Sequence, residues 1–531
     1  ADRGWDRWAL AGYAVSSGNL NAPYERIKQI GWLTTFVAFL STLILARTVT
    51  WRRLLIRLDD KITSLSSVFA FFMGVMTSLV LMVALFTLTI DGQLNFLRRT
   101  HVSLGLGLLT TGILYLEPSI VVIAMATIVL WVLSFYHPEH AIYWIVLWAP
   151  FFLYPVQLYR FAFPMSELLL LIAFSAWSFK YILRFTQRYF LGGLPLTAPL
   201  KLRATDWLML SWCTLGIVAW LNSDYRAAAT TNFRTMIIEP VLFYLLLRTT
   251  LTTSRKVSYL MWSLVASAIL ASLFSLGMFI LGEGIITAEG ATQRVAGIYG
   301  FPNNLALYLE RILPFIVFYA VLVNRRVVRV LMGIVVLLLI GLIALTQSVG
   351  AITLGLPSML LFGLGIYYRK KSFLPIAVVL VVIVWGIFSL SQLPRFTKIL
   401  DLSEGTSFFR LRLWQSSLQM LEDHPVLGLG LDQFLYAYRG VYILPDAWQE
   451  PNLSHPHNII FDFGLRFGIG GMIYLIVLQL VYWKRFISLN RDAPHLLPNE
   501  RAWLFGGVCA MIGLVFHGMV DNSIFVNDLV L

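Results

Sequence analysis

The chain has 531 residues, of which 58% are hydrophobic and 13% are charged, and its mean hydropathy is +0.77. Soluble domains carry roughly 25% charged residues, so this composition excludes an ordinary soluble domain. Apolar runs long enough to cross a bilayer as helices recur along the chain, without the alternation of barrel strands. The sequence therefore predicts an all-α fold, a polytopic bundle of about 12–15 transmembrane helices.

The formal net charge is +13. One interpretation is a partner of opposite charge, either nucleic acid or an anionic lipid. The other is the positive-inside rule, by which Lys and Arg gather in cytoplasmic connections. The second is favoured because basic residues cluster between apolar runs, at 184–203, 248–256, 325–329, 369–371 and 484–501. We therefore expect no nucleic-acid partner, only membrane lipids around the bundle, and these five clusters on the cytoplasmic side.

Residues 1–100 are predicted to add transmembrane segments to the N-terminal end of the bundle. The candidate spans are Gly31–Thr50 and Val68–Ile90. The basic segment Trp51–Lys61 lies between them and leaves two alternatives open. Either it lies flat on the membrane as an amphipathic helix, or one basic cluster of this region is external.

Three further regions follow in chain order. Residues 101–391 are predicted to form the transmembrane core, and 392–456 a long external, periplasmic loop with one or two short helices, the clearest at Phe408–Leu421. Residues 457–531 return to the membrane as C-terminal spans. The best-defined apolar runs of these regions are Ser119–Tyr136, Val257–Leu281, Val327–Leu345, Phe373–Leu390 and Ile459–Trp483.

Several polar residues stand where external connections meet apolar runs. Arginine suits a bidentate grip on phosphate, helix N-termini attract anions, and histidine can act as a general base. Such residues predict a diphosphate leaving group and an attacking alcohol, with no metal and no cofactor. The candidates are Arg234, Asn303, Asn304, Arg410, Trp414, His457 and Asn458.

The same residues also have plainer interpretations. External arginines bind lipid phosphates, and an Asn pair suits the cap of a helix. Glu310 lies inside an apolar run and is either part of a structural ion pair or a site contact. His517 is expected to be a packing residue. His455 and His457 have no other His or Cys near them in sequence, so no zinc-site spacing is visible.

Four short motifs occur in a fixed order. They are Gly300-Phe-Pro-Asn-Asn-Leu-Ala; Thr346-Gln-Ser-Val-Gly-Ala; Phe409-Arg-Leu-Arg-Leu-Trp followed by Asp423-His-Pro-Val-Leu-Gly-Leu-Gly; and His457-Asn458 with Gly468-Ile-Gly-Gly after nine residues. Together they resemble the motifs of the bacterial O-antigen ligase and polymerase superfamily, over roughly residues 103–531. Two positions depart from its pattern: Val349 stands where Arg is usual, and Arg466 where an acidic residue is common.

The resemblance implies a metal-independent membrane glycosyltransferase of cell-envelope polysaccharide biosynthesis. Its donor would be a glycan on a polyprenyl diphosphate such as undecaprenyl diphosphate, used at the periplasmic face of the inner membrane. The acceptor hydroxyl would belong to lipid A–core of lipopolysaccharide, to a growing glycan or to a protein. By motif match His457 would be the base, Arg410 a catalytic and diphosphate contact, and Arg234 and Asn303 further diphosphate contacts. Asn304, Trp414 and Asn458 would be supporting residues.

Two other classes of protein stay open. A multipass transporter would place its charged residues in the middle of the membrane and show paired broken helices in two halves. In this sequence the halves show no such symmetry, and the polar groups cluster on one side. A non-catalytic subunit of a membrane complex is compatible with the additional N-terminal segments, although Arg410 and His457 favour an enzyme.

Overall fold

The computed structural model describes residues 99–116, 120–158, 161–190, 202–288, 292–368, 405–522 and 524–526. The candidate spans in residues 1–98, the basic segment Trp51–Lys61 and the run Phe373–Leu390 lie outside these ranges. The chain divides into two compact units. Within the described residues, the first contains 99–141, 155–158, 161–163 and 171–186, and the second contains the rest.

The first unit is built from apolar helices. Its elements are α5 (Thr100–Leu114), α6 (Ile120–Tyr136), the start of α7 (Pro138–Trp148), the hairpin of β1 (Val156–Leu158) and β2 (Phe161–Phe163), and most of α8 (Met165–Phe190). Trp131, Phe135 and Phe179 pack their rings together between α6 and α8. Lys180 Nζ donates to the Phe135 carbonyl at 2.9 Å, which ties the end of α6 to α8.

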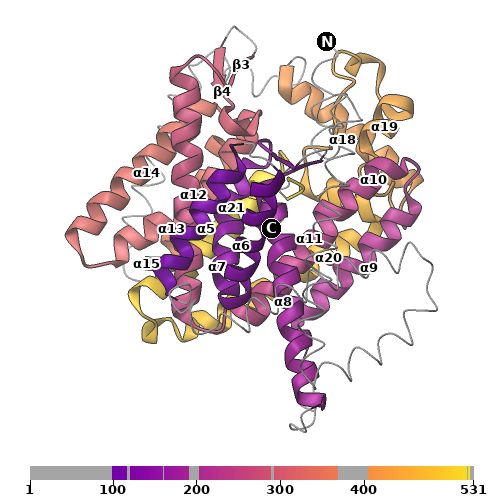
Figure 1. The fold of residues 1–531 in the computed structure, drawn as a ribbon. Coiled ribbons are helices and arrows are strands. Elements are labelled where there is room, and N and C mark those ends of the chain that lie inside the picture. The colour runs from indigo at the N-terminus through magenta and orange to yellow at the C-terminus, as the bar shows by residue number, and fades with distance from the viewer. Residues whose placement is uncertain are drawn as a thin grey trace, which may run out of the picture. The chain divides into compact units, whose positions relative to one another are not determined.

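The second unit holds the longer helices (Figure 1). Its N-terminal part contains α9 (Ala204–Asn222), α10 (Arg226–Phe233), α11 (Glu239–Thr250), α12 (Ser254–Ile280), and the hairpin of β3 (Ile285–Ala288) and β4 (Thr292–Val295). Then come α13 (Pro302–Leu322), α14 (Arg326–Thr346), α15 (Leu356–Tyr368), α18 (Gly405–Asp423), α19 (Phe434–Ala437), α20 (Ile459–Arg491) and α21 (Pro498–Gly518). Helix α13 packs against α14 and α21 around a core that includes Tyr299, Leu305 and Leu309.

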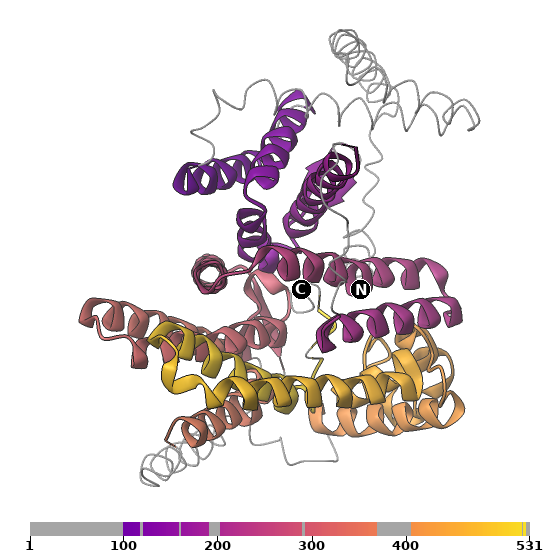
Figure 2. The ribbon, with the colours of Figure 1, turned by 90° about the horizontal axis from the view of Figure 1, so that it is seen from below.

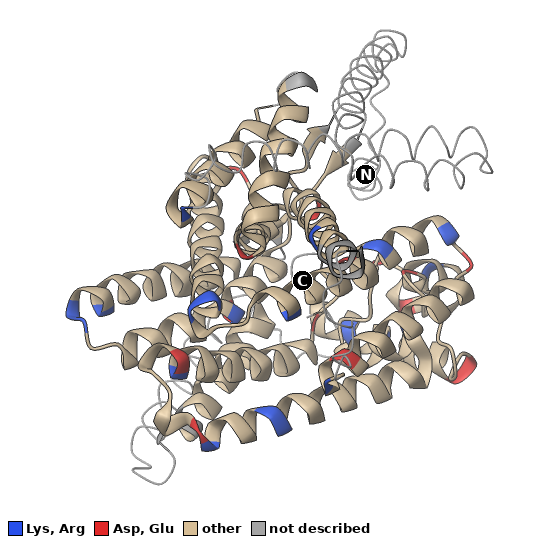
Figure 3. Cartoon of the chain, turned by 60° about the horizontal axis from the view of Figure 1, so that its bottom comes forward, with Lys and Arg blue, Asp and Glu red and all other residues tan. Residues whose placement is uncertain are grey.

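Seven helices of the described ranges are long and apolar enough to cross a membrane. They are α9, α12, α13, α14, α20, α21 and the Met165–Leu183 part of α8. In Figure 3 the middle stretches of these helices are largely free of charge, and Lys and Arg gather toward their ends. The predicted all-α polytopic membrane fold is confirmed. The helix predicted over Phe408–Leu421 is also present, as α18.

The hairpin β3–β4 was not predicted. It lies in the connection 282–303, where Ile285 pairs with Val295 and Ala288 with Thr292 in antiparallel register. The sequence showed no strand signal because each strand has only four residues. A strand of this length is at the lower limit over which alternation of side chains can be recognised.

Helix ends that the charge pattern places on one side of the membrane meet in the structure. At the end predicted to be cytoplasmic, Asn499 of α21 donates to Ser258 of α12 at 3.0 Å. At the opposite end, Asn458 at the start of α20 donates to the Met519 carbonyl just after α21, also at 3.0 Å. Each contact joins helix ends that the charge pattern assigns to the same side, and the orientation in the membrane stays a prediction.

The turn after α18, residues 423–430, packs backbone to backbone against the glycine-rich segment 468–471 of α20. Gly468 has φ +63° and ψ −153°, which kinks α20, and a Cβ there would lie 2.0 Å from the Val426 carbonyl oxygen. Ile469 N donates to Pro425 O at 2.9 Å across the same contact. Only glycine fits so close a backbone approach with positive φ. Helix α18 also packs along α20 (Figure 2). The backbone contact at Gly468 therefore fixes α18 relative to the start of α20.

Candidate functional site

A cavity of about 310 Å³ opens in the second unit where α18, the β3–β4 hairpin and the start of α20 come together. Its polar walls are made by residues far apart in the sequence. Of the predicted site residues, it contains His457, Arg410 and Asn303. The full lining is Arg294, Asn303, Val349, Thr406, Phe409, Arg410, Leu413, Glu450, Leu453 and His457.

Asp521 joins the polar residues around this cavity. Its carboxylate is 3% exposed and follows the C-terminal end of α21. Oδ1 lies 2.8 Å from His457 Nδ1, and Oδ2 accepts from Asn303 Nδ2 at 2.7 Å. Arg410 Nη2 lies 3.8 Å from the same Oδ2. One buried carboxylate therefore connects three predicted site residues.

Asp521 is ionised at neutral pH. Burial by itself would raise the pKa of its carboxyl, but the charge and hydrogen bond of His457 and the charge of Arg410 hold that pKa well below its usual range. The ionised carboxylate accepts the Nδ1–H of His457, which selects the tautomer of the ring. Nε2 is then the nitrogen of His457 that can accept a proton.

The backbone around His457 is held in an unusual conformation. His457 has φ +49°, a left-handed value that is uncommon for residues other than glycine. Trp414 Nε1 donates to the carbonyl of Pro456 at 3.0 Å, and Asn458 caps α20 by accepting from Ile460 N and Phe461 N. Trp414 and Asn458, both predicted to be supporting residues, therefore fix the chain on either side of His457.

Arg410 reaches the cavity from α18. Trp414 is one helical turn further along α18, as the spacing of four residues predicts. Phe409 and Leu413 provide apolar wall beside Arg410. The side chain of Arg410 is 16% exposed, so a ligand in the cavity would find its guanidinium partly desolvated.

Two predicted residues lie apart from this arrangement. Arg234, at the start of a π-helical turn, forms ion pairs with Glu167 and, at 3.6 Å, with Glu239, and it does not line the cavity. Asn304 lies in the first turn of α13, next to Asn303, and is also not a lining residue. Their roles as a second diphosphate contact and as a supporting residue stay predictions.

The sequence interpretation missed Asp521, Arg294 and His455. Asp521 follows the last predicted span on the external side, so a polar residue there was a usable signal. Arg294 lies in the hairpin that was not predicted.

His455 stacks edge-on against His457, with ring centroids 4.1 Å apart. Burial, and then the charge of His457, lower the pKa of His455 well below its ordinary value, so its imidazole is neutral.

Arg466 and the buried pair of Glu310 and His517 have structural partners. Arg466 Nε donates to Asp462 at 2.7 Å, and its guanidinium lies over the ring of Phe525 at 4.3 Å. His517 Nδ1 lies 2.8 Å from Glu310 Oε1, and both side chains are fully buried. This geometry favours the structural alternative for Glu310, with His517 as its partner.

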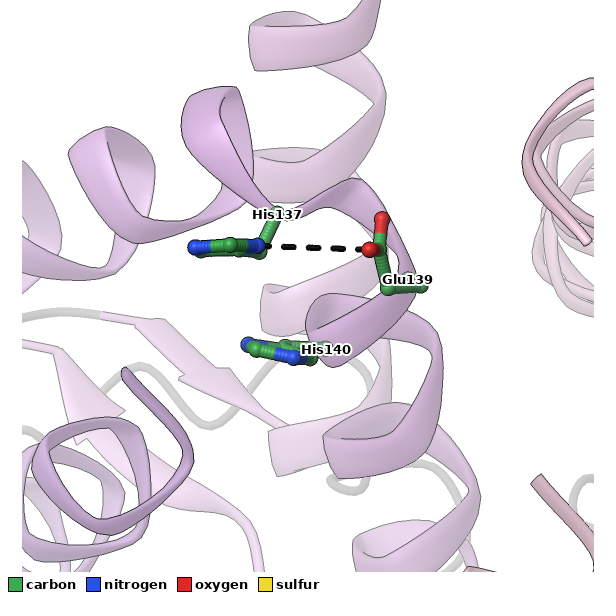
Figure 4. Close-up of side chains that lie close together, drawn as sticks. All are labelled: His137, Glu139 and His140. Carbon is green, nitrogen blue, oxygen red and sulfur yellow. Dashed lines mark ion pairs between the residues drawn. The ribbon is translucent and has the colours of Figure 1, made fainter. Parts of the chain in front are cut away.

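Two groups of side chains in the described ranges have the composition of a metal site. His455, His457 and Asp521 form one of them at the cavity, and the spacing of the sequence did not show it because Asp521 is 64 residues from His457. The other is His137, Glu139 and His140 in the first unit, where the two rings stack with centroids 4.5 Å apart and Glu139 lies beside His137 (Figure 4). His140 Nδ1 lies 2.9 Å from Ser103 Oγ.

Residues 333–476 match the model of the O-antigen ligase family. This segment is an O-antigen ligase domain. It contains the motifs at Thr346, at Phe409 and at His457, so the resemblance drawn from the motifs is confirmed. The chain therefore contains a segment similar to O-antigen ligases, and its apolar spans make it a multi-pass membrane protein. No curated protein matches the chain.

Proposed function

We propose that the protein transfers a glycan from a polyprenyl diphosphate to an acceptor hydroxyl at the external face of the cytoplasmic membrane. The observation that carries this proposal is the convergence of His457, Asp521 and Arg410 on one cavity. A histidine that a carboxylate holds in one tautomer is suited to removing a proton. An arginine beside it is suited to stabilising a departing anion.

The proposed step balances as follows. Nε2 of His457 takes the proton of the acceptor hydroxyl, and the oxygen forms a bond to the anomeric carbon of the donor glycan. The bond from that carbon to the diphosphate oxygen breaks, and its electron pair stays on the departing polyprenyl diphosphate. Arg410 stabilises the negative charge that grows on the leaving group, which is worth most where water is partly excluded.

Asp521 acts as a positioning residue in this scheme. Its carboxylate fixes the ring of His457 and stabilises the imidazolium that forms when Nε2 is protonated, as an aspartate does beside histidine in serine proteases. We propose that no metal is required, because the arginine charge can neutralise the leaving diphosphate. The acceptor would be lipid A–core, a growing glycan or a protein.

The test is transfer by the purified protein in lipid vesicles or nanodiscs, with a synthetic undecaprenyl-diphosphate oligosaccharide as donor. A panel with a lipid A–core acceptor, the donor itself and a periplasmic protein extract separates ligase, polymerase and protein-glycosylating activity. We expect a glycosylated product with one of the three. If none forms while the intact donor crosses the vesicle bilayer, the transporter alternative would replace this proposal.

A further inference from the structure

Arg294 is a second arginine at the cavity and, unlike Arg410, it is buried; it lies on strand β4 opposite Ile286 of β3. Its side chain is 8% exposed, although a solvated hairpin would allow it to point into water. Nε donates to the Thr346 carbonyl at 2.8 Å and Nη2 donates to Asn303 Oδ1 at 2.7 Å. A buried guanidinium that is held in one orientation and lines a cavity is suited to binding an anion there.

The hydrogen bonds of Arg294 connect it to the proposed base. Asn303 accepts from Arg294 through Oδ1 and donates to Asp521 through Nδ2, and Asp521 in turn holds His457. Arg294, Arg410 and His457 therefore line one cavity; Arg410 and His457 contact the Asp521 carboxylate directly, and Arg294 is connected to it through Asn303. A change in the position of Arg294 would reach His457 through two side chains.

Val349 lines the same cavity three residues after Thr346, whose carbonyl holds Arg294. The motif around Val349 is the one in which the sequence departs from its family by lacking an arginine. The cavity nevertheless contains a second arginine, delivered by the hairpin instead of by the turn after α14. The cavity therefore has the positive charge that position 349 does not supply, because Arg294 provides it from the hairpin.

We propose that Arg294 is the second diphosphate-binding arginine of this site and replaces the basic contact that Val349 does not provide. The inference rests on the proposed glycan transfer and assigns Arg294 to the leaving polyprenyl diphosphate. Two arginines on one cavity divide the charge of the two phosphate groups. The bond to the sugar breaks with its electron pair on the diphosphate, and Arg294 and Arg410 both stabilise that charge.

A charge-relocation experiment tests this role. Arg294→Gln should weaken binding of the undecaprenyl-diphosphate donor and slow transfer by roughly 10²–10³-fold, the usual effect of removing one transition-state donor. Arg294→Gln combined with Val349→Arg should recover at least about tenfold of the lost transfer, because it returns an arginine to the same cavity. Arg255→Gln, an exposed arginine at the start of α12, is the matched control and should transfer like the wild type.

The outcomes separate this inference from the proposed function. If the wild-type protein transfers no glycan, the proposed function fails. If the wild type is active and Arg294→Gln matches it, the inference fails by itself. Slow transfer with unchanged donor binding, and no recovery with Val349→Arg, would reduce Arg294 to a structural contact of α14 and overturn the assignment. If the glutamine variant does not fold, Arg294→Lys replaces it. We then expect at least tenfold slower transfer by a folded protein, and wild-type transfer would overturn the assignment.

Discussion

Oδ1 of Asp521 lies 2.8 Å from Nδ1 of His457, although the two residues are 64 positions apart. This contact sets the tautomer of the proposed base and places a buried negative charge behind it. It also joins two helix ends, since His457 precedes α20 and Asp521 follows α21. The proposed role of His457 therefore depends on a residue that no sequence motif indicated.

Asp521→Asn should slow glycan transfer by roughly 10²–10⁴-fold, the usual contribution of a positioned general base. The amide keeps the size of the side chain but removes the charge that stabilises the imidazolium. We expect kcat to fall while KM for the donor changes little. Asp446→Asn is the control, since Asp446 pairs with Arg412 in the same loop and is largely exposed. Equal kcat for Asp521→Asn and the wild type would remove the positioning role.

Helix boundaries and motifs are the local features by which the sequence singles out most of the candidate residues. Asn303, His457 and Asn458 stand at the starts of helices, and Arg410 and Trp414 share a helical face, so local rules place them. Asp521 and Arg294 could not be paired with them in the same way. Their contacts depend on which helix ends meet, and tertiary packing decides that.

Acidification should destabilise the protein partly through His455. Its half-buried imidazole is neutral because its pKa is lowered, whereas the unfolded chain has an ordinary histidine pKa of 6.5. Below that value the unfolded state binds more protons, so the free energy of unfolding falls as pH falls, until the folded-state pKa is reached. The loss therefore begins near pH 6.5 and continues down to the folded-state pKa of His455.

The measurement is thermal unfolding in nanodiscs at pH 7.5, 6.5 and 5.5. His455→Phe keeps a flat ring and should lose less stability over this range than the wild type. An identical loss in both proteins would show that His455 titrates freely.

Glycan transfer should survive chelation of divalent ions. Asp521 is already engaged by His457 and Asn303, and arginine can neutralise the diphosphate. Transfer is measured after dialysis against EDTA, with and without added magnesium, manganese or zinc. Loss of activity that one of these ions restores would contradict the prediction. His140→Ala and His455→Ala would then show which of the two groups of potential ligands holds the ion.

The two ends of α20 should face opposite sides of the membrane. Ser454 precedes the helix and Ser488 lies near its C-terminal end, and both are exposed. In a background without Cys213 and Cys509, Ser454→Cys should react with an impermeant thiol reagent added outside cells, and Ser488→Cys only after permeabilisation. Labelling of Ser488→Cys from outside would reverse the predicted orientation.

The most direct test of the account is single-turnover transfer by His457→Ala together with binding of the undecaprenyl-diphosphate donor. If His457 is the base, the variant should bind the donor nearly as well as the wild type and transfer the glycan roughly 10²–10⁴-fold more slowly. Arg410→Ala should differ by weakening both donor binding and transfer, and Arg410→Lys should restore only part. A folded His457→Ala protein that transfers glycan at the wild-type rate would contradict the proposed mechanism.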